Sequence, residues 1–373
     1  MSPVMTILMG LLLACVVVFV MTWAHLVFWT HRLRNSDTLP YDELETLPTP
    51  DGARIELRRL HAQGDPVGPP MLLVHGLAFN HRNFDIHPTW SLPRWLSARG
   101  RDVWLLTLRS GQSTAKFEGK RNFAAMVEHD LPTAVDAVLA RTSAQQVDYI
   151  GFSMGGMLLY GALGRTIDTS RVRKAVIMGS PGRLKIPVWP FSLTPWVPQW
   201  FVPRLHLRLG ARLIAFCTDW FKTPFHRIPY NPDNVERGIV GGLLVDGVQD
   251  VPRPLNQDFV GWALGDGELR VRGERALDGL AAVDVPVLFC AGQADQLAPP
   301  GSVRYAFDMW GSARTPGAEG VDLVEKRWLL LAKSAGAGHD YGHGDMLMAR
   351  DSVQDVFEPI ADFVGVRSMK TEA

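Results

Sequence analysis

Short apolar runs alternate with longer helix-like segments along most of this 373-residue chain, and few architectures accommodate such a pattern. Several runs are apolar at almost every position, as expected for strands that helices cover on both faces. We predict six such strands, at 71–76, 102–108, 147–151, 174–179, 285–292 and 327–332. The segment 123–142, between two of them, has apolar residues at helix spacing. Strands that alternate with helices indicate an α/β fold with a mostly parallel sheet.

The alternation is interrupted once, between Ser180 and about Val283. This stretch shows no clear strand, and its Pro- and Trp-rich beginning, KIPVWPFSLTPWVPQWFVP, is followed by several helical patterns. An ordinary connection between two strands is far shorter than the roughly 100 residues found here. We therefore expect residues 181–283 to form a helical cap or lid, inserted into a core made of residues 69–180 and 284–366.

The N-terminal segment is a second strong feature, because no charged residue occurs from Val4 to Thr30. An apolar stretch of about 20 residues is enough to cross a bilayer as a helix. Trp23 and Trp29 lie near its far end, where aromatic side chains often meet the membrane surface. A cleaved signal peptide is the alternative, but the segment lacks a basic start, is too long and does not end in a small-residue cleavage site. We predict an uncleaved transmembrane anchor at 4–30, and hence a single-pass membrane protein.

Residues 31–68 connect this anchor to the core. They begin with the basic sequence HRLR, whereas the chain before the anchor has no Lys or Arg. The positive-inside rule then places the larger, C-terminal part of the chain in the cytoplasm. Turn signals at Asp51-Gly52 and Gly64-Asp65 flank the sequence IELRRLHA, so we expect a juxtamembrane stretch followed by a first β-hairpin. All strands of the predicted core begin beyond residue 70, so the anchor is expected to contribute nothing to them.

Charge and cysteine content exclude some functions. The chain has 38 Lys plus Arg residues and 38 Asp plus Glu residues, without a basic run interleaved with aromatic residues. Nucleic acid is therefore not an expected partner. Cys15, Cys217 and Cys290 are too widely spaced to suggest a disulfide framework or a metal-ligand pair, which agrees with a cytoplasmic location. No cofactor is expected.

The sequence VDYIGFSMGG at 147–156 carries the strongest chemical signal. A predicted strand leads into Gly151-Phe152-Ser153-Met154-Gly155, and a helical pattern follows without a linker. Gly and Ser are common in tight turns, so the simplest interpretation is a turn alone. The pattern Gly-x-Ser-x-Gly is also typical of a nucleophile elbow, in which a strained turn exposes the serine oxygen. Residues elsewhere in the chain have to distinguish these two interpretations.

A serine nucleophile needs a base and an acid that orients this base. Asp295 follows a predicted strand in VLFCAGQADQLAPP and is the candidate acid, although Asp is also a common turn residue. After the last strand, GAGHDYGHGDML offers His339 and His343. His343 is the preferred base because it lies where the loop returns to the sheet, and His339 is the alternative. Their spacing would suit a metal on a helix, but the surrounding glycines argue against a helix, so no metal is expected.

The oxyanion that forms during acyl transfer needs two backbone N–H donors. One would be the residue after the nucleophile, Met154. The other would come from the loop after an earlier strand, where His75-Gly76-Leu77 contains a glycine that permits a tight turn. We assign this donor to the N–H of Leu77. Each feature alone is weak, but serine, acid, histidine and oxyanion loop in this order, each after a predicted strand, favour the nucleophile elbow.

With these residues in place, the chain resembles the α/β-hydrolase superfamily, and within it the lysosomal acid lipase and gastric lipase group. Four stretches are similar to that group: LLVHGLAFNHRNF, DVWLLTLR, MVEHDLPTAVDAVL and YGHGD. In the last stretch the group has a catalytic histidine two residues before an aspartate, which implies His343 and not His339. The resemblance covers about residues 70–180 and 285–365, and it implies an α/β-hydrolase fold with an ester-cleaving triad.

The chain also departs from that group. Phe152 and Met154 flank the serine where those lipases usually carry histidine and glutamine. The cap sequence shows no similarity, and an anchor replaces the secretory signal. The resemblance therefore implies the fold and the triad, and it implies lipid specificity only through the group as a whole.

The sequence therefore predicts a membrane-anchored serine hydrolase whose substrate is a small-molecule or lipid carboxylic ester. Trp189, Trp196 and Trp200, at the start of the cap, are candidate substrate-binding residues, and the alternative is that they form the core of the cap itself. Two other functions stay open at this point. One is acyl transfer to an alcohol or thiol from the same acyl-serine. The other is a catalytically silent hydrolase fold used for binding, which a complete set of site residues disfavours.

Overall fold

An eight-stranded sheet forms the centre of the computed structural model, which describes residues 2–34, 39–112, 114–116, 118–184, 202–313 and 324–366. The order across the sheet is β1-β2-β4-β3-β5-β6-β9-β10. These strands are β1 (Glu43–Pro48), β2 (Arg54–Leu60), β3 (Met71–Val74), β4 (Val103–Thr107), β5 (Val147–Phe152), β6 (Val172–Met178), β9 (Val287–Gly292) and β10 (Lys326–Leu331). Strand β2 runs antiparallel to both of its neighbours. Six strands, in the order β4-β3-β5-β6-β9-β10, pair in parallel. The predicted mostly parallel sheet and first hairpin are thus confirmed.

Successive residues of the central strands pack on opposite faces of the sheet. On β3, Leu72 and Val74 belong to one buried apolar cluster, whereas Met71 and Leu73 belong to another. The first cluster includes residues of α4 (Leu131–Thr142), α5 (Met154–Ala162) and α9 (Pro300–Met309), and the second includes residues of α2 (Leu92–Ser97) and α10 (Glu358–Val364). Helices therefore cover both faces, which explains why the strands are apolar at almost every position.

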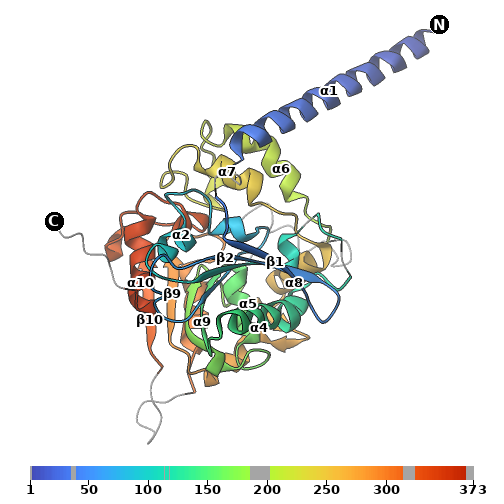
Figure 1. Cartoon of the computed structure of the whole chain (residues 1–373). Helices are drawn as coiled ribbons and strands as arrows, with labels where there is room; N and C mark the ends of the chain where they lie inside the picture. The colour runs from blue at the N-terminus through green and yellow to red at the C-terminus, as the bar shows by residue number, and fades with distance from the viewer. Residues whose placement is uncertain are drawn as a thin grey trace, which may run out of the picture.

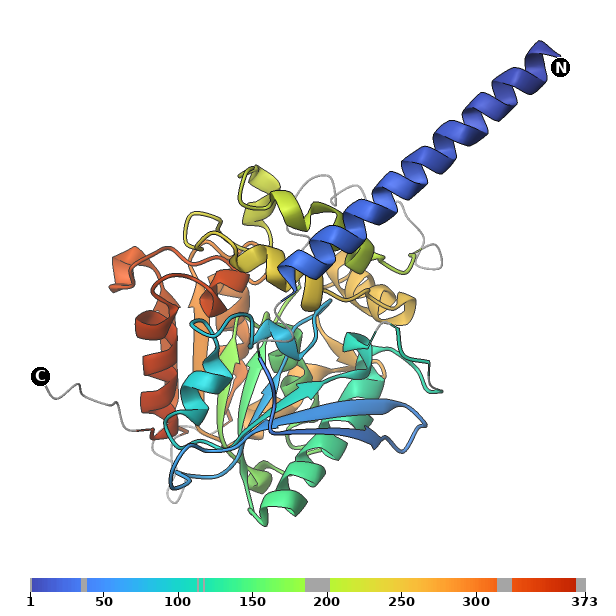
Figure 2. The same ribbon diagram turned by 45° about the horizontal axis from the view of Figure 1, so that its top comes forward.

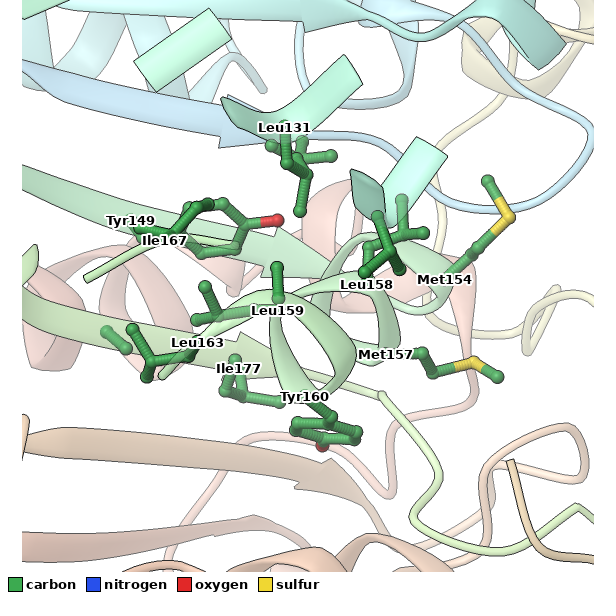
Figure 3. Close-up of a cluster of buried hydrophobic side chains, with 14 of the residues drawn as sticks. Leu131, Tyr149, Met154, Met157, Leu158, Leu159, Tyr160, Leu163, Ile167 and Ile177 are labelled. Carbon is green, nitrogen blue, oxygen red and sulfur yellow. The ribbon is translucent and has the colours of Figure 1, made fainter. Parts of the chain in front are cut away.

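Helix α5 is the most completely buried of the covering helices, because every residue from Met154 to Ala162 is buried. Figure 3 shows this helix packed over β5 and β6, and Leu159 and Ile177 belong to the same buried cluster. The hydroxyl of Tyr149 donates a 2.7 Å hydrogen bond to the carbonyl of Gly155, which ties β5 to the first turn of the helix. This rigid unit holds the turn between β5 and α5, where Ser153 lies.

The helix predicted at 123–142 is present but interrupted. It consists of α3 (Phe123–Ala125), a π-helical turn (Met126–Asp130) and α4. The π-helical turn lies just before Pro132. Proline has no backbone N–H, so it cannot donate the hydrogen bond to the preceding turn that a regular α-helix requires.

Residues 202–283, called the insert below, lie between β6 and β9. They contain α6 (Leu207–Ile214), α7 (Ile239–Asp246) and α8 (Arg253–Leu264). The expectation that this stretch lacks strands is wrong in one place, where β7 (Arg270–Val271) and β8 (Glu274–Arg275) form a small hairpin. Arg272 and Gly273 at its tip both have positive φ, as a two-residue turn between twisted strands requires. Strands of two residues are too short to produce an alternating pattern in a sequence.

Helix α1 (Pro3–Leu33) projects away from the rest of the molecule (Figures 1 and 2). Its most apolar 18-residue window has a mean hydropathy of 2.9 and is fully exposed, so the helix is long and apolar enough to cross a membrane. The helix continues three residues beyond the predicted end of the anchor. At a rise of about 1.5 Å per residue it is about 46 Å long, more than a bilayer core of about 30 Å requires.

The surplus length of α1 packs against the insert. The ring of Trp29 lies 5.6 Å from that of Phe216, and Nε2 of His25 lies 3.3 Å from the carbonyl oxygen of Leu213. Trp23, in contrast, is exposed. The two tryptophans at the far end of the apolar segment thus differ in their surroundings, because only Trp29 packs against the insert among the described residues.

Candidate active site

Ser153 occupies the turn between β5 and α5. Its backbone angles, φ 52° and ψ −118°, are ones that residues with a side chain rarely adopt. Glycines make this turn possible. A Cβ atom on Gly151 would lie 2.5 Å from the nitrogen of Gly156, and one on Gly155 would lie 2.0 Å from the carbonyl oxygen of Val74. Strained conformations of this kind are concentrated at functional sites and persist where the surrounding structure enforces them. Ser153 is therefore held at the C-terminal end of β5 by packing that only glycines permit.

Asp295 and His343 lie next to each other and are both buried. The Nδ1 of His343 is 2.7 Å from the Oδ2 of Asp295. The other carboxylate oxygen, Oδ1, accepts hydrogen bonds from the backbone N–H groups of Leu297 (2.8 Å) and Ala298 (2.7 Å). Because a carboxylate only accepts, Nδ1 of His343 carries the proton, and Nε2 is left with its lone pair in the neutral ring.

The imidazole of His343 lies beside the turn that holds Ser153. Its ring centre is 4.9 Å from that of Phe152, the residue before the serine. A Cβ atom on Gly179, directly after β6, would lie 3.3 Å from two atoms of the same ring. Among the described residues, no hydrogen bond joins Ser153 to His343. Bonds between nucleophile and base are often long before substrate binds, so this geometry is compatible with catalysis.

His339 has different surroundings. Its Nε2 lies 2.9 Å from the Oδ2 of Asp351, and its ring faces Tyr341 at a distance of 6.1 Å. Asp351 is partly exposed, whereas Asp295 is buried. The structure thus brings His343, and not His339, into contact with the predicted acid.

The loop that carries His343 is fastened by the buried carboxylate of Asp345. This group accepts hydrogen bonds from the backbone of Gly342 (2.9 Å), the backbone of Asn231 (3.0 Å) and the side chain of Asn234 (2.7 Å). Burial raises the pKa of Asp345, although these three donors oppose the shift. Asn231 and Asn234 belong to the insert, and sequence analysis assigned no role to them because their partner lies more than a hundred residues away.

The N–H groups of both predicted oxyanion donors are available to bind a ligand. Within the part of the chain that the structure describes, neither the N–H of Leu77 nor that of Met154 has a hydrogen-bond partner. Met154 is the first residue of α5, where helices leave N–H groups unpaired and favour negative charge. The loop before Leu77 passes close to the nucleophile, since a Cβ atom on Gly76 would lie 3.1 Å from the Cβ of Ser153.

His75 is a third histidine near the site, and its role is structural. Its Nε2 accepts a hydrogen bond from the N–H of Leu108 (3.1 Å), and its Nδ1 lies 2.8 Å from the carbonyl oxygen of Gly76. Burial lowers the pKa of His75 to about 4, so the ring is neutral. Asn83, which sequence analysis also left without a role, accepts the N–H of Gly76 at 3.0 Å. Both residues lie in the stretch LLVHGLAFNHRNF, which could have drawn attention to them.

Other candidate groups are few. No cluster of three or more His, Cys, Asp or Glu side chains in the described ranges is placed to hold a metal ion. All three cysteines are free thiols, and burial raises the pKa of Cys290 to about 12, which makes it unreactive. The candidate substrate-binding residues Trp189, Trp196 and Trp200 lie outside the described residues.

Known proteins similar to this chain agree with its fold. Residues 69–324 match the family described as alpha/beta hydrolase fold. Over 136 residues the chain is 29% identical to gastric triacylglycerol lipase of Homo sapiens, a match that covers 31% of this chain and 33% of the lipase. Over 112 residues it is 30% identical to a protein of Schizosaccharomyces pombe described as a probable lipase, covering 27% of this chain and 24% of that protein. The resemblance to the gastric lipase group is thus confirmed, but the chain spans a third or less of the length of these relatives.

A solved structure extends the comparison to nearly the whole chain. The crystal structure of a bacterial membrane phospholipase A superposes with a TM-score of 0.53, and the match covers 98% of each chain. Sequence identity is 14%, so this similarity concerns the fold alone.

Proposed function

Because this chain belongs to the alpha/beta hydrolase fold family, we propose that it is a membrane-anchored serine hydrolase that cleaves carboxylic esters. The observation that carries the proposal is the buried pair of His343 and Asp295 beside the strained turn of Ser153. A turn with a structural role alone would need neither this buried imidazole nor two unpaired N–H groups next to it. The partial sequence similarity to two lipases supports an ester as the substrate.

The proposed reaction uses the geometry as follows. The Oγ of Ser153 attacks the ester carbonyl while Nε2 of His343 takes its proton, and Asp295 stabilises the imidazolium that forms. The N–H groups of Leu77 and Met154 donate to the oxyanion of the tetrahedral intermediate. The imidazolium returns the proton to the departing alcohol. Water, deprotonated by the same imidazole, then attacks the acyl carbonyl. The bond to Oγ of Ser153 breaks, the imidazolium returns the proton to Oγ, and the acid leaves.

The insert is proposed to form a cap over this site. It contacts the loops on either side of the nucleophile, since the carbonyl of Pro229 accepts the N–H of Gly344 at 2.8 Å and that of Gly247 accepts the N–H of Asn80 at 3.1 Å. Trp189, Trp196 and Trp200 stay predictions as residues that line an acyl pocket. A small-molecule or lipid ester with an apolar acyl group is the substrate class that such a pocket fits.

Helix α1 is proposed to anchor the protein in a membrane. About 20 of its residues would fill the bilayer core, which leaves the last turns free to contact the insert. The basic sequence HRLR at its end favours the cytoplasm for the catalytic part, by the positive-inside rule.

The proposal is tested with a fluorophosphonate probe, which reacts with activated serine residues. Ser153→Ala in the full chain, purified in detergent, should lose labelling and should lose hydrolysis of p-nitrophenyl butyrate by a factor of about 10⁴ or more in kcat. Its unfolding temperature should stay unchanged, because only one oxygen atom is removed. Ser170→Ala, an exposed serine, is the control and should behave as wild type. Labelling that persists in Ser153→Ala would mean that the turn is not a nucleophile elbow.

A further inference from the structure

Residues 76–80, called the oxyanion loop here, contain a strained position. Ala78 has φ 63°, a backbone conformation that is uncommon for a residue with a side chain. It directly follows Leu77, whose N–H is the proposed oxyanion donor. A strained backbone persists only where its surroundings hold it, so the contacts of this loop decide where the Leu77 N–H points.

Three of the hydrogen bonds that hold the oxyanion loop come from the insert. The carbonyl of Ala78 accepts the N–H of Gln249 at 2.7 Å. Asn80 donates its backbone N–H to the carbonyl of Gly247 at 3.1 Å and its side-chain amide to the carbonyl of Asp246 at 2.9 Å. All three partners lie at the C-terminal end of α7 or within three residues of it. The end of α7 is therefore the main contact of the loop within the insert.

The opposite side of α7 packs against the end of helix α1. A Cβ atom on Gly241 would lie 3.1 Å from the carbonyl oxygen of Ala215 and 3.3 and 3.4 Å from the two terminal methyl groups of Leu33, so both the turn after α6 and the end of α1 approach closely at this glycine. The Nε of Arg34 lies 3.6 Å from a carboxylate oxygen of Asp246. Asp246 thus faces the anchor through its side chain and the oxyanion loop through its backbone. In Figure 1, α7 lies between the end of α1 and the sheet.

We infer that the last turns of α1, acting through α7, position the Leu77 N–H for oxyanion binding, with Asp246 and Asn80 as positioning residues. The inference rests on the proposed function, because the direction of this N–H matters only if an oxyanion forms there. Helix α7 has eight residues, and Gly241 lies within about one and a half turns of its last residue, so we expect a shift at Gly241 to displace the carbonyl groups at its far end. The anchor is then part of the catalytic scaffold as well as a membrane attachment.

The kinetic signature of this arrangement is specific. An oxyanion exists in the transition state and not in the bound substrate, so a displaced donor lowers kcat and leaves KM nearly unchanged. Removing one such donor outright lowers kcat by a factor of about 10² to 10³. We expect displacement of the loop to lower kcat by about tenfold or more, up to the loss that follows from removing the donor.

The first experiment separates α7 from α1 in the full chain, held in detergent or in lipid nanodiscs. Gly241→Leu places a bulky side chain where Leu33 packs, and kcat for p-nitrophenyl butyrate, per site titrated with fluorophosphonate, should fall about tenfold or more with KM within about twofold. Gly210→Leu is the matched control, because a Cβ atom on this exposed glycine of α6 would meet nothing within 4 Å. Adding Leu33→Ala to Gly241→Leu makes room on the side of α1 and should restore part of kcat, because the carbonyl oxygen of Ala215 still limits the space.

The second experiment changes Asn80, which joins the oxyanion loop to the end of α7. Asn80→Asp keeps the oxygen that accepts the N–H of Arg82 but loses the amide that donates to Asp246. Both kcat and the affinity for a trifluoromethyl ketone, which binds serine hydrolases as an oxyanion, should fall by similar factors. A residue that only stabilises the fold would lower the unfolding temperature and the number of titrated sites, without changing kcat per site.

The outcomes distinguish this inference from the proposed function. Unchanged kcat per titrated site in Asn80→Asp, or in folded Gly241→Leu, would overturn the inference while Ser153 stays the labelled nucleophile. Wild-type protein without any labelling at Ser153 would overturn both proposals together. If Gly241→Leu does not yield folded protein, Asn80→Asp alone decides, because it leaves the packing of the helices intact.

Discussion

Asp295 and His343 are 48 positions apart in the sequence, yet Oδ2 of the carboxylate accepts a 2.7 Å hydrogen bond from Nδ1 of the imidazole. The two residues meet because they follow β9 and β10, which are parallel neighbours and therefore end at the same edge of the sheet. Oδ1 of Asp295 is already occupied by two backbone N–H groups. Oδ2 is therefore the carboxylate oxygen that remains for a side chain, and Nδ1 of His343 donates to it.

This arrangement predicts the result of Asp295→Asn. The amide oxygen has to face the N–H groups of Leu297 and Ala298, so the NH₂ group points at Nδ1 of His343. Nδ1 must then accept, the proton moves to Nε2, and the ring can no longer take the proton of Ser153. We expect kcat to fall by about 10³ to 10⁴ with little change in KM, measured with a soluble ester. Near-normal kcat in this variant would contradict the assigned orientation of the ring.

The two histidines of the last loop should differ sharply. His343→Ala is expected to lose nearly all activity, by about 10³-fold or more in kcat, because it removes the base. His339→Ala should keep most of its activity, since its partner is Asp351 and not the buried acid. Asp351→Asn serves as the matched control for local charge. Activity is compared at several pH values, and an inactive His339 variant beside an active His343 variant would reverse the assignment.

His75 predicts a pH dependence of folding stability. Its pKa is lowered by burial to about 4 in the folded protein, whereas a histidine in the unfolded chain has a pKa of about 6.5. Between these values the unfolded chain binds more protons, so stability is lost as the pH falls from about 6.5 towards 4. At pH 5 the expected loss is about 2 kcal/mol from this residue.

Urea unfolding in detergent at pH 7 and pH 5 measures this loss. In His75→Gln the free energy of unfolding should change less between the two pH values than in the wild type, because the titrating ring is gone. His206→Gln, which removes an exposed histidine, is the matched control. Equal pH dependence in the wild type and His75→Gln would show that His75 is not the buried neutral group described here.

Membrane anchoring is tested by extraction. The full chain should stay with membranes after an alkaline carbonate wash, and a chain lacking residues 2–24 should be released, because it no longer has an apolar stretch that can span the bilayer. This deletion retains the residues that contact the insert. Protease should reach the catalytic part only in inside-out vesicles. A mature protein that lacks the first residues by mass spectrometry would identify the segment as a cleaved signal instead.

The sequence by itself determined the features that depend on neighbouring residues. Mostly apolar runs of five to eight residues identified the buried strands, because a strand covered on both faces has few positions for a polar side chain. The segment from Val4 to Thr30 identified a long apolar helix, because it has no charged residue and exceeds the length of about 20 residues that a membrane span requires. The motif around Ser153 was recognisable because the turn requires glycine at fixed positions.

Tertiary structure decided which distant residues meet. Sequence reasoning left His339 beside His343 as a base, and only the parallel pairing of β9 with β10 and the anchoring of the loop by Asp345 separate their surroundings. Nothing in the sequence indicated that Leu33 would pack on Gly241, or that α7 would contact both α1 and residues 76–80. Periodicity reports whether a side chain is buried, whereas its partner depends on how the whole chain closes.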